Sequence, residues 1–109
     1  MTEPLDWPAL RAHCAGDEAL VAEVIALFRR EVEGQSSDVV KAVAARDPAA
    51  LKNAAHRLKG ALVSLAAGPA TECAVALERC GTRGELHAAP ALLAQLQQEI
   101  ARLLAVLSG

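Results

Sequence analysis

A histidine, a lysine and a glycine lie close together in the run Ala-His-Arg-Leu-Lys-Gly at residues 55–60. A neutral imidazole carries a lone pair that can attack phosphorus, so His56 is a candidate nucleophile. In a helix Lys59 would lie about one turn away, where its ammonium could hold a phosphoryl oxygen by a charge-assisted hydrogen bond. Gly60 has no side chain that would obstruct a partner, although its place in a helix could equally serve close helix packing. These residue types are suited to carrying a phosphoryl group, but their spacing alone does not name a reaction.

The direction of His56 follows from the apolar pattern around it. At about 100° per helical residue, Leu58, Leu62 and Leu65 fall within about 40° of Leu51. His56 falls about 160° from the centre of this apolar arc, so we expect its side chain to face solvent. We expect a partner to dock on the same face of this helix and to contact the preceding long helix as well. The candidate docking residues are Lys52, Asn53 and Val63, and Arg57 is expected to lie at the periphery.

Helical signals cover most of the chain. Asp6, Asp17 and Asp47 each precede a periodic apolar segment and are suited to capping a helix N-terminus. Sustained strand alternation is missing, so we predict an all-α fold, an antiparallel four-helix bundle with a short additional N-terminal helix. The predicted helices run to Cys14, over 18–45, from Pro48 to a break at Gly68-Pro69, from that break to a loop at 81–84, and over 86–107.

Length and composition limit the possible classes of protein. A chain of 109 residues is predicted to form a single domain, 1–109. A net charge of -2 argues against nucleic acid as a partner, because such binding requires a strongly basic surface. The chain lacks an apolar run of the roughly 18 residues that a membrane span needs. Its N-terminus also lacks the basic and apolar regions of a signal peptide, so we expect a cytoplasmic protein.

The cysteines are expected to be reduced. Three of them, Cys14, Cys73 and Cys80, make an odd number without a dense disulfide framework. Cys73 and Cys80 lie seven residues apart and are expected to pack in the core. On the same helix we expect Glu72 and Glu78 to be exposed.

A metal site is the weakest of the alternatives. It would have to combine the three cysteines with His13, His56 and His87, and those spacings match no standard zinc pattern. We therefore expect no bound metal, and we expect His13 and His87 to lie at the surface or at helix ends.

The motif at His56, Lys59 and Gly60 resembles the His-x-Leu-Lys-Gly signature of histidine phosphotransfer (HPt) domains, the four-helix modules of multistep two-component phosphorelays. The similarity extends over nearly the whole chain. Leu-Glu-Arg at 77–79, Gly-Glu-Leu at 84–86 and a closing leucine-rich helix follow at the family's usual distances. Family members often have small or hydroxyl residues just after the glycine and another glycine ten residues past the histidine; here those positions are Ala61, Leu62 and Ala66.

The resemblance implies a definite role. His56 would accept a phosphoryl group from a phospho-aspartate on a receiver domain and pass it to an aspartate of another receiver. Lys59 would stabilise the phosphate and Gly60 would keep access open. The implied partners are response-regulator receiver domains and a hybrid sensor histidine kinase, and the receiver would supply the bound Mg²⁺, so that the chain needs no cofactor of its own.

Other properties of the protein stay open at this point. A bundle of this shape could also be a non-phosphorylated interaction module that binds a receiver or kinase domain. The chain is too short for a dimerisation helix pair and a nucleotide-binding domain, so autonomous kinase activity is not expected. We expect a monomer and, from Met1 and the full set of helices, a free-standing protein.

Overall fold

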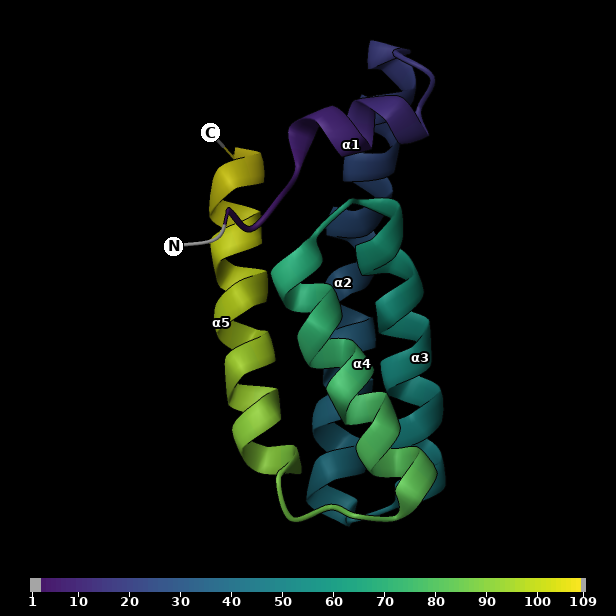
Figure 1. The fold of residues 1–109 in the computed structure, drawn as a ribbon, viewed down its shortest axis with the longest axis vertical. Helices are drawn as coiled ribbons and strands as arrows, with labels where there is room; N and C mark the ends of the chain where they lie inside the picture. Colours follow the sequence, from purple (N-terminus) through teal and green to yellow (C-terminus); the bar gives the residue numbers. More distant parts are fainter. Residues whose placement is uncertain (1–2, 109) are drawn as a thin grey trace.

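Residues 3–108 are described by a computed structural model, in which helices joined by short connections form a bundle (Figure 1). The helices are α1 (Trp7–His13), α2 (Glu18–Ala45), α3 (Pro48–Ser64), α4 (Gly68–Arg83) and α5 (Ala89–Ser108). Consecutive long helices run in opposite directions, and α1 lies across the end where α2 begins. Within residues 3–108 there is no strand, so the predicted all-α bundle with a short N-terminal helix is confirmed.

Aspartates begin three of the helices, as the sequence predicts. Each carboxylate accepts a hydrogen bond from a backbone N–H of the first turn, at 3.0 Å for Asp6, 2.9 Å for Asp17 and 3.1 Å for Asp47. Such a cap satisfies a backbone donor that has no partner inside the helix and stabilises the helix by about 1 kcal/mol. The predicted starts of α1, α2 and α3 therefore agree with the structure.

The length of α2 sets the length of the molecule. Its 28 residues at a rise of 1.5 Å each give about 42 Å, close to the longest dimension of 41 Å. Gly34 lies in the middle of this helix without interrupting it. Helices α3 and α5 pack along α2, and α4 packs against α3 and α5. The resulting rod-shaped bundle presents α3 and α4 side by side on one face (Figure 1).

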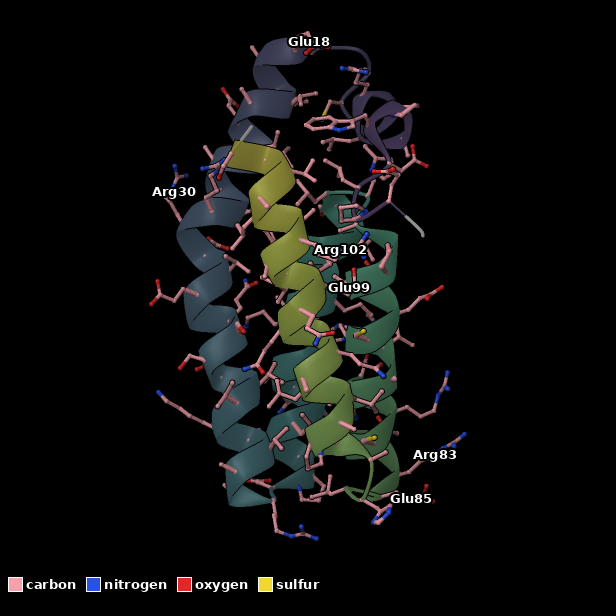
Figure 2. The ribbon with its side chains drawn as sticks, turned by 90° about the vertical axis from the view of Figure 1, so that its left-hand side faces the viewer. Glu18, Arg30, Arg83, Glu85, Glu99 and Arg102 are labelled. Atoms are coloured by element: carbon pink, nitrogen blue, oxygen red, sulfur yellow. The ribbon has the colours of Figure 1, made fainter. Side chains whose placement is uncertain are left out.

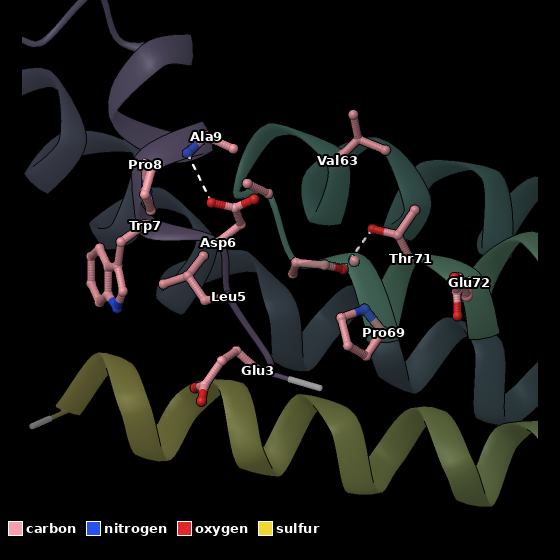
Figure 3. A pocket seen from close by; sticks show the side chains of 13 residues that line it. Glu3, Leu5, Asp6, Trp7, Pro8, Ala9, Val63, Pro69, Thr71 and Glu72 are labelled. Carbon is pink, nitrogen blue, oxygen red and sulfur yellow. Dashed lines mark hydrogen bonds between the residues drawn. The ribbon is translucent and has the colours of Figure 1, made fainter. Parts of the chain in front are cut away.

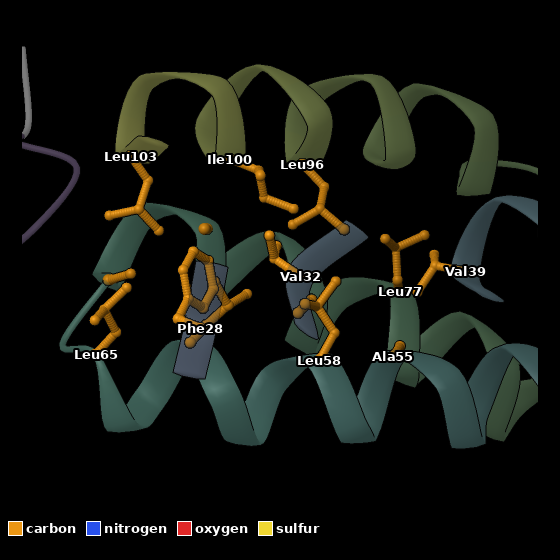
Figure 4. Close-up of a cluster of buried hydrophobic side chains, with 14 of the residues drawn as sticks. Phe28, Val32, Val39, Ala55, Leu58, Leu65, Leu77, Leu96, Ile100 and Leu103 are labelled. Carbon is orange, nitrogen blue, oxygen red and sulfur yellow. The ribbon is translucent and has the colours of Figure 1, made fainter. Parts of the chain in front are cut away.

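The core is filled by aliphatic side chains and by the ring of Phe28, which project from all four long helices (Figure 4). Burying each such side chain stabilises the fold by about 1.5–3 kcal/mol. The predicted apolar faces of α3 and α5 are confirmed at their centres, where side chains are fully buried. The largest fully buried side chains are Leu10, Val39, Leu51, Leu58, Leu62, Leu65, Leu77, Leu96 and Leu103.

Charged side chains stay on the outside of the bundle (Figure 2). Among the described residues, no polar or charged residue is classed as buried. On α5, Arg102 Nη1 donates to the Glu99 carboxylate at 2.7 Å, one turn earlier on the same helix.

Within residues 3–108, no helix is both long enough and apolar enough to cross a membrane.

The predicted loop at 81–84 is wrong for its first three residues. Helix α4 continues through Arg83, and Gly84 ends it with a φ of 68°. Gly81 is helical and buried because it faces the backbone of α3. A Cβ at Gly81 would lie 2.5 Å from the Lys52 nitrogen and 2.7 Å from the Pro48 oxygen. Gly81 therefore allows α3 and α4 to pack closely and does not form a turn.

Two other predicted boundaries also shift. Helix α3 ends at Ser64, before the Gly68-Pro69 break, and α5 begins at Ala89, three residues later than predicted. The connection after α3 includes Ala66 with a φ of 60°, in the left-handed region. The Ala66 carbonyl accepts a hydrogen bond from the backbone N–H of Asp6 at 3.1 Å, which ties the N-terminal segment to this connection.

Candidate functional site

His56 lies on the exposed side of α3, as its position in the helical pattern predicts. Its side chain is 66% exposed, whereas the adjacent Ala55 and the nearby Leu58 are fully buried. The imidazole therefore projects from a helix whose opposite face is packed into the core. Such a helix holds the ring in one place while leaving it open to a partner.

Glu78, on α4, is the closest charged group to the imidazole. One of its oxygens lies 2.9 Å from His56 Nδ1, and the other lies 2.7 Å from Lys59 Nζ. Its side chain is 20% exposed, so the prediction that Glu78 is an exposed residue of α4 is wrong. The carboxylate joins the two residues of the motif from a different helix.

The close contact of α3 and α4 explains why Glu78 reaches His56. Glu78 is one turn before Gly81, the residue at which the two backbones touch. Because Gly81 has no Cβ, α4 comes near enough for a glutamate side chain to span the remaining gap. We call the zone formed by His56, Lys59, Glu78 and Gly81 the α3–α4 seam.

The two basic partners keep Glu78 ionised. The pKa of the Glu78 carboxyl is lowered from its ordinary value of 4.5, mainly by the hydrogen bond from Lys59. Partial burial acts in the opposite direction, and the hydrogen bond from His56 lowers the pKa further. An ionised carboxylate only accepts hydrogen bonds, so the ring nitrogen that faces it, Nδ1, must carry the proton. The lone pair of a neutral His56 is then on Nε2, the nitrogen that does not face Glu78.

Lys59 has an acidic partner within the protein. The Glu78 carboxylate is in direct contact with both His56 and Lys59. The Lys59 side chain is 28% exposed. An ammonium has three N–H donors, so the bond to Glu78 leaves donors for a second acceptor.

Gly60 lies next to open space. It is exposed, and a Cβ at this position would meet no atom of another residue within 4 Å beyond its own helix backbone and chain neighbours. The alternative that Gly60 serves close packing against a neighbouring helix is therefore wrong; Gly81 has that role. The absence of a side chain at Gly60 leaves the surface beside His56 uncovered.

The candidate docking residues are all exposed, but they border different features. Lys52 lies on the α3 segment that contacts Gly81, and Val63 is 49% exposed two turns after His56. Asn53 lines a groove of about 400 Å³ between α2 and α3. Arg57, which the sequence analysis treats as peripheral, lines the same groove.

The cysteines and the other two histidines are not residues of the α3–α4 seam, although Cys80 directly precedes Gly81 in the chain. Cys14 is buried, while Cys73 and Cys80 are only half-buried at the edge of the core. Burial raises the pKa of the Cys73 thiol, with smaller contributions from nearby carboxylates. His13 and His87 are exposed, as predicted. Within residues 3–108, no three His, Cys, Asp or Glu side chains are grouped in a way that could hold a metal ion.

Glu78 is the residue beside His56 that the sequence analysis missed. Its helical position at the edge of the α4 apolar face resembles that of any solvated glutamate, because the pattern of one helix carries no information about the neighbouring helix. The available signal was Gly81, one turn later. A glycine inside a helix marks a place where another backbone can approach, and a carboxylate beside it can reach across.

Comparisons with known proteins agree with this geometry. Residues 23–106 match the Hpt domain family. The crystal structure of histidine-containing phosphotransfer protein B (HptB) from Pseudomonas aeruginosa PAO1 is similar, with a TM-score of 0.83 and 29% sequence identity over 95% of this chain and 92% of that chain. The comparison with curated proteins gave no match. The chain therefore belongs to the Hpt domain family, whose members carry out histidine phosphotransfer in two-component phosphorelays together with receiver domains and kinases.

Proposed function

We propose that His56 is the phosphoacceptor of this domain. It would take a phosphoryl group from a phospho-aspartate on one receiver domain and pass it to an aspartate on another. One observation carries the proposal: Nδ1 of the exposed imidazole lies 2.9 Å from a Glu78 carboxylate oxygen. Because an ionised carboxylate only accepts hydrogen bonds, we assign the proton to Nδ1, which leaves Nε2 as the free nucleophile.

The bonds in this transfer balance without a cofactor on the chain. The Nε2 lone pair attacks phosphorus, and the bond from phosphorus to the aspartyl oxygen breaks as the bond to nitrogen forms. The aspartate leaves as a carboxylate. The ring keeps its Nδ1 proton and gains positive charge, which the Glu78 carboxylate at 2.9 Å stabilises. Transfer to the second receiver is the reverse of these steps.

The partner would supply the remaining chemistry. We propose that the receiver binds the Mg²⁺ that neutralises phosphoryl oxygens, and that Lys59 donates to one of those oxygens while it keeps its bond to Glu78. In-line positioning and charge neutralisation account for most of the catalysis in phosphoryl transfer. A monomer is sufficient for this role, and a hybrid sensor histidine kinase would deliver the phosphoryl group to the first receiver.

The test is to incubate the domain with a receiver that has been phosphorylated with labelled phosphate. We expect label that is acid-labile and base-stable, as for phosphohistidine, and we expect His56→Gln to abolish it. His87→Gln is the matched control, because His87 is also exposed. A domain that binds the receiver but stays unlabelled would favour a non-phosphorylated interaction module, and unchanged labelling of His56→Gln would refute the assignment.

Lys59 can be tested in the same assay. Lys59→Ala is expected to slow the transfer or shorten the lifetime of the phosphorylated form, because one donor to the phosphoryl oxygens is lost. Lys41→Ala, an exposed lysine on α2, is the control for the change in charge. Equal rates and lifetimes for the two variants would contradict a role of Lys59 at the phosphate.

A further inference from the structure

An open pocket lies at the α1 end of the bundle, between the N-terminal segment and the α3–α4 connection (Figure 3). It is bounded by residues 3–9 of the N-terminal segment and by residues 63–72 around the α3–α4 connection, and its volume is about 860 Å³. Its apolar lining includes Leu5, Trp7, Val63 and Pro69. We call this feature the end pocket.

Three carboxylates border the end pocket, and none of its lining residues is basic. Asp6 uses one of its oxygens to cap α1. Glu3 and Glu72 are both exposed, and neither forms an ion pair with another residue of the 3–108 segment. The pocket therefore combines apolar side chains with two carboxylates that form no ion pair within residues 3–108.

Val63 connects the end pocket to the phosphoacceptor face. It follows His56 by seven residues on α3, which places it on the same side of the helix, about 10 Å along the axis. A transient protein complex buries about 600 Å² on each partner, which corresponds to a circular patch with a radius of about 14 Å. A protein whose phosphorylated aspartate lies over His56 is therefore large enough to reach the end pocket.

The charges along this face differ from one end to the other. Lys52 lies one turn before His56 on α3, on the side away from the pocket, and Glu3 and Glu72 lie at the pocket. An acidic phosphorylation site on a receiver suits the lysine, and a cationic side chain suits the two glutamates. Opposite charges at the two ends of one interface fix the orientation in which a partner docks.

We propose that the end pocket is a second contact for the receiver, and that it selects receivers which present an apolar side chain next to a lysine or arginine. The inference rests on the proposed function, because the receiver must dock over His56 to reach the pocket. The apolar side chain would fill the space lined by Leu5, Trp7 and Val63, and the cation would pair with Glu3 or Glu72.

Trp7 provides a direct readout, because it is the chain's one tryptophan and it lines the pocket. The experiment titrates the full chain with unphosphorylated receiver domains that lack tryptophan and follows Trp7 emission. Receivers that bind are expected to change this emission. Glu3→Gln/Glu72→Gln should raise Kd about fivefold at low salt, with the difference shrinking at high salt, as expected for charge pairs at the rim of an interface.

The matched control is Glu23→Gln/Glu85→Gln, which removes two exposed carboxylates outside the pocket. The proposal is supported if the control binds as the unchanged chain does while the pocket variant binds more weakly. It is overturned if both variants bind equally well, or if Trp7 emission responds to a free diamine such as putrescine but to none of the receivers. Because this titration needs no phosphoryl transfer, an unlabelled His56 would refute the proposed function separately from the pocket contact.

Discussion

The α3–α4 seam and the end pocket lie on the same face of the bundle but are built in opposite ways. At the seam, the two helices approach until the backbone of α3 leaves no room for a Cβ at Gly81. At the end pocket, the N-terminal segment and the α3–α4 connection stand apart and leave about 860 Å³ open. The first region is held by short polar contacts, and the second is joined by the single backbone bond from Asp6 to Ala66 that the structure describes.

The difference agrees with the functions that we propose for the two regions. Phosphoryl transfer depends on the position of one nitrogen to a fraction of an ångström, so the seam fixes the imidazole through a carboxylate on another helix. Partner recognition depends on surface that is free before the partner arrives. Variants of the two regions should therefore separate the rate of transfer from the affinity for the receiver.

The largest effect is expected at Glu78. Glu78→Ala removes the acceptor of the Nδ1 proton, so the ring can rotate and change its tautomer, and the rate of transfer within the complex should fall about 100-fold. The receiver Kd should stay nearly unchanged. Single-turnover transfer at saturating receiver separates the two quantities, with Glu85→Ala as the control. A loss that comes only from weaker binding would show that Glu78 belongs to the docking surface instead of positioning the ring.

Gly81 tests the close packing of the seam. Gly81→Ala introduces a Cβ that overlaps the α3 backbone, and it should lower the free energy of unfolding by about 1–3 kcal/mol. Gly34→Ala is the matched control: Gly34 is also helical but borders open space, so this change should stabilise the protein by about 1 kcal/mol. Denaturant unfolding measures both. Shifts of the same sign in the two variants would contradict the packing role of Gly81.

Ala66 tests the looser end of the molecule. Its φ of 60° costs about 1 kcal/mol for a residue with a Cβ, so Ala66→Gly should raise the free energy of unfolding by about that amount. Ala67→Gly is the control, because Ala67 has a φ of -94° and gains nothing from glycine. Thermal unfolding of both variants measures the difference. A destabilised Ala66→Gly would mean that the connection does not need the left-handed conformation.

The smallest effect is expected in the pH dependence of stability. The folded-state pKa of Glu78 is below its ordinary value of 4.5, so its contribution to stability is complete above that pH. The contribution is lost as the pH falls from 4.5 through the lowered folded-state pKa, because the unfolded chain binds the proton more readily. Unfolding measured at several acidic pH values should show a shallower dependence for Glu78→Gln than for the unchanged chain. Parallel curves would indicate that the ion pairs of Glu78 do not stabilise the fold.

Much of the fold could be predicted from the sequence because its signals are local. The capping aspartates at Asp6, Asp17 and Asp47 act within one turn, and helical periodicity decides which leucines face inward. The same periodicity correctly predicts that His56 is exposed. Gly60 and Val63 are exposed for the same reason.

The remaining features could not be predicted because they depend on distances between helices. In the sequence alone, Gly81 resembles a turn residue, because the α3 backbone that lies against it is many residues away in the chain. Glu78 likewise resembles a solvated residue, because the sequence does not show that it faces His56. The end pocket combines segments that are more than fifty residues apart in the chain. A periodic pattern describes one helix at a time, so it cannot report on contacts of this kind.

The contact at Gly81 also bears on how such a domain can change during evolution. Any larger residue there would separate α3 from α4 and disturb the position of the proposed phosphoacceptor nitrogen, so few substitutions at that position could be inherited. Carboxylates on an open rim can be replaced one by one without harming the chemistry. A duplicated gene could therefore acquire new signalling partners by drift at Glu3 and Glu72 while its reaction centre stays the same.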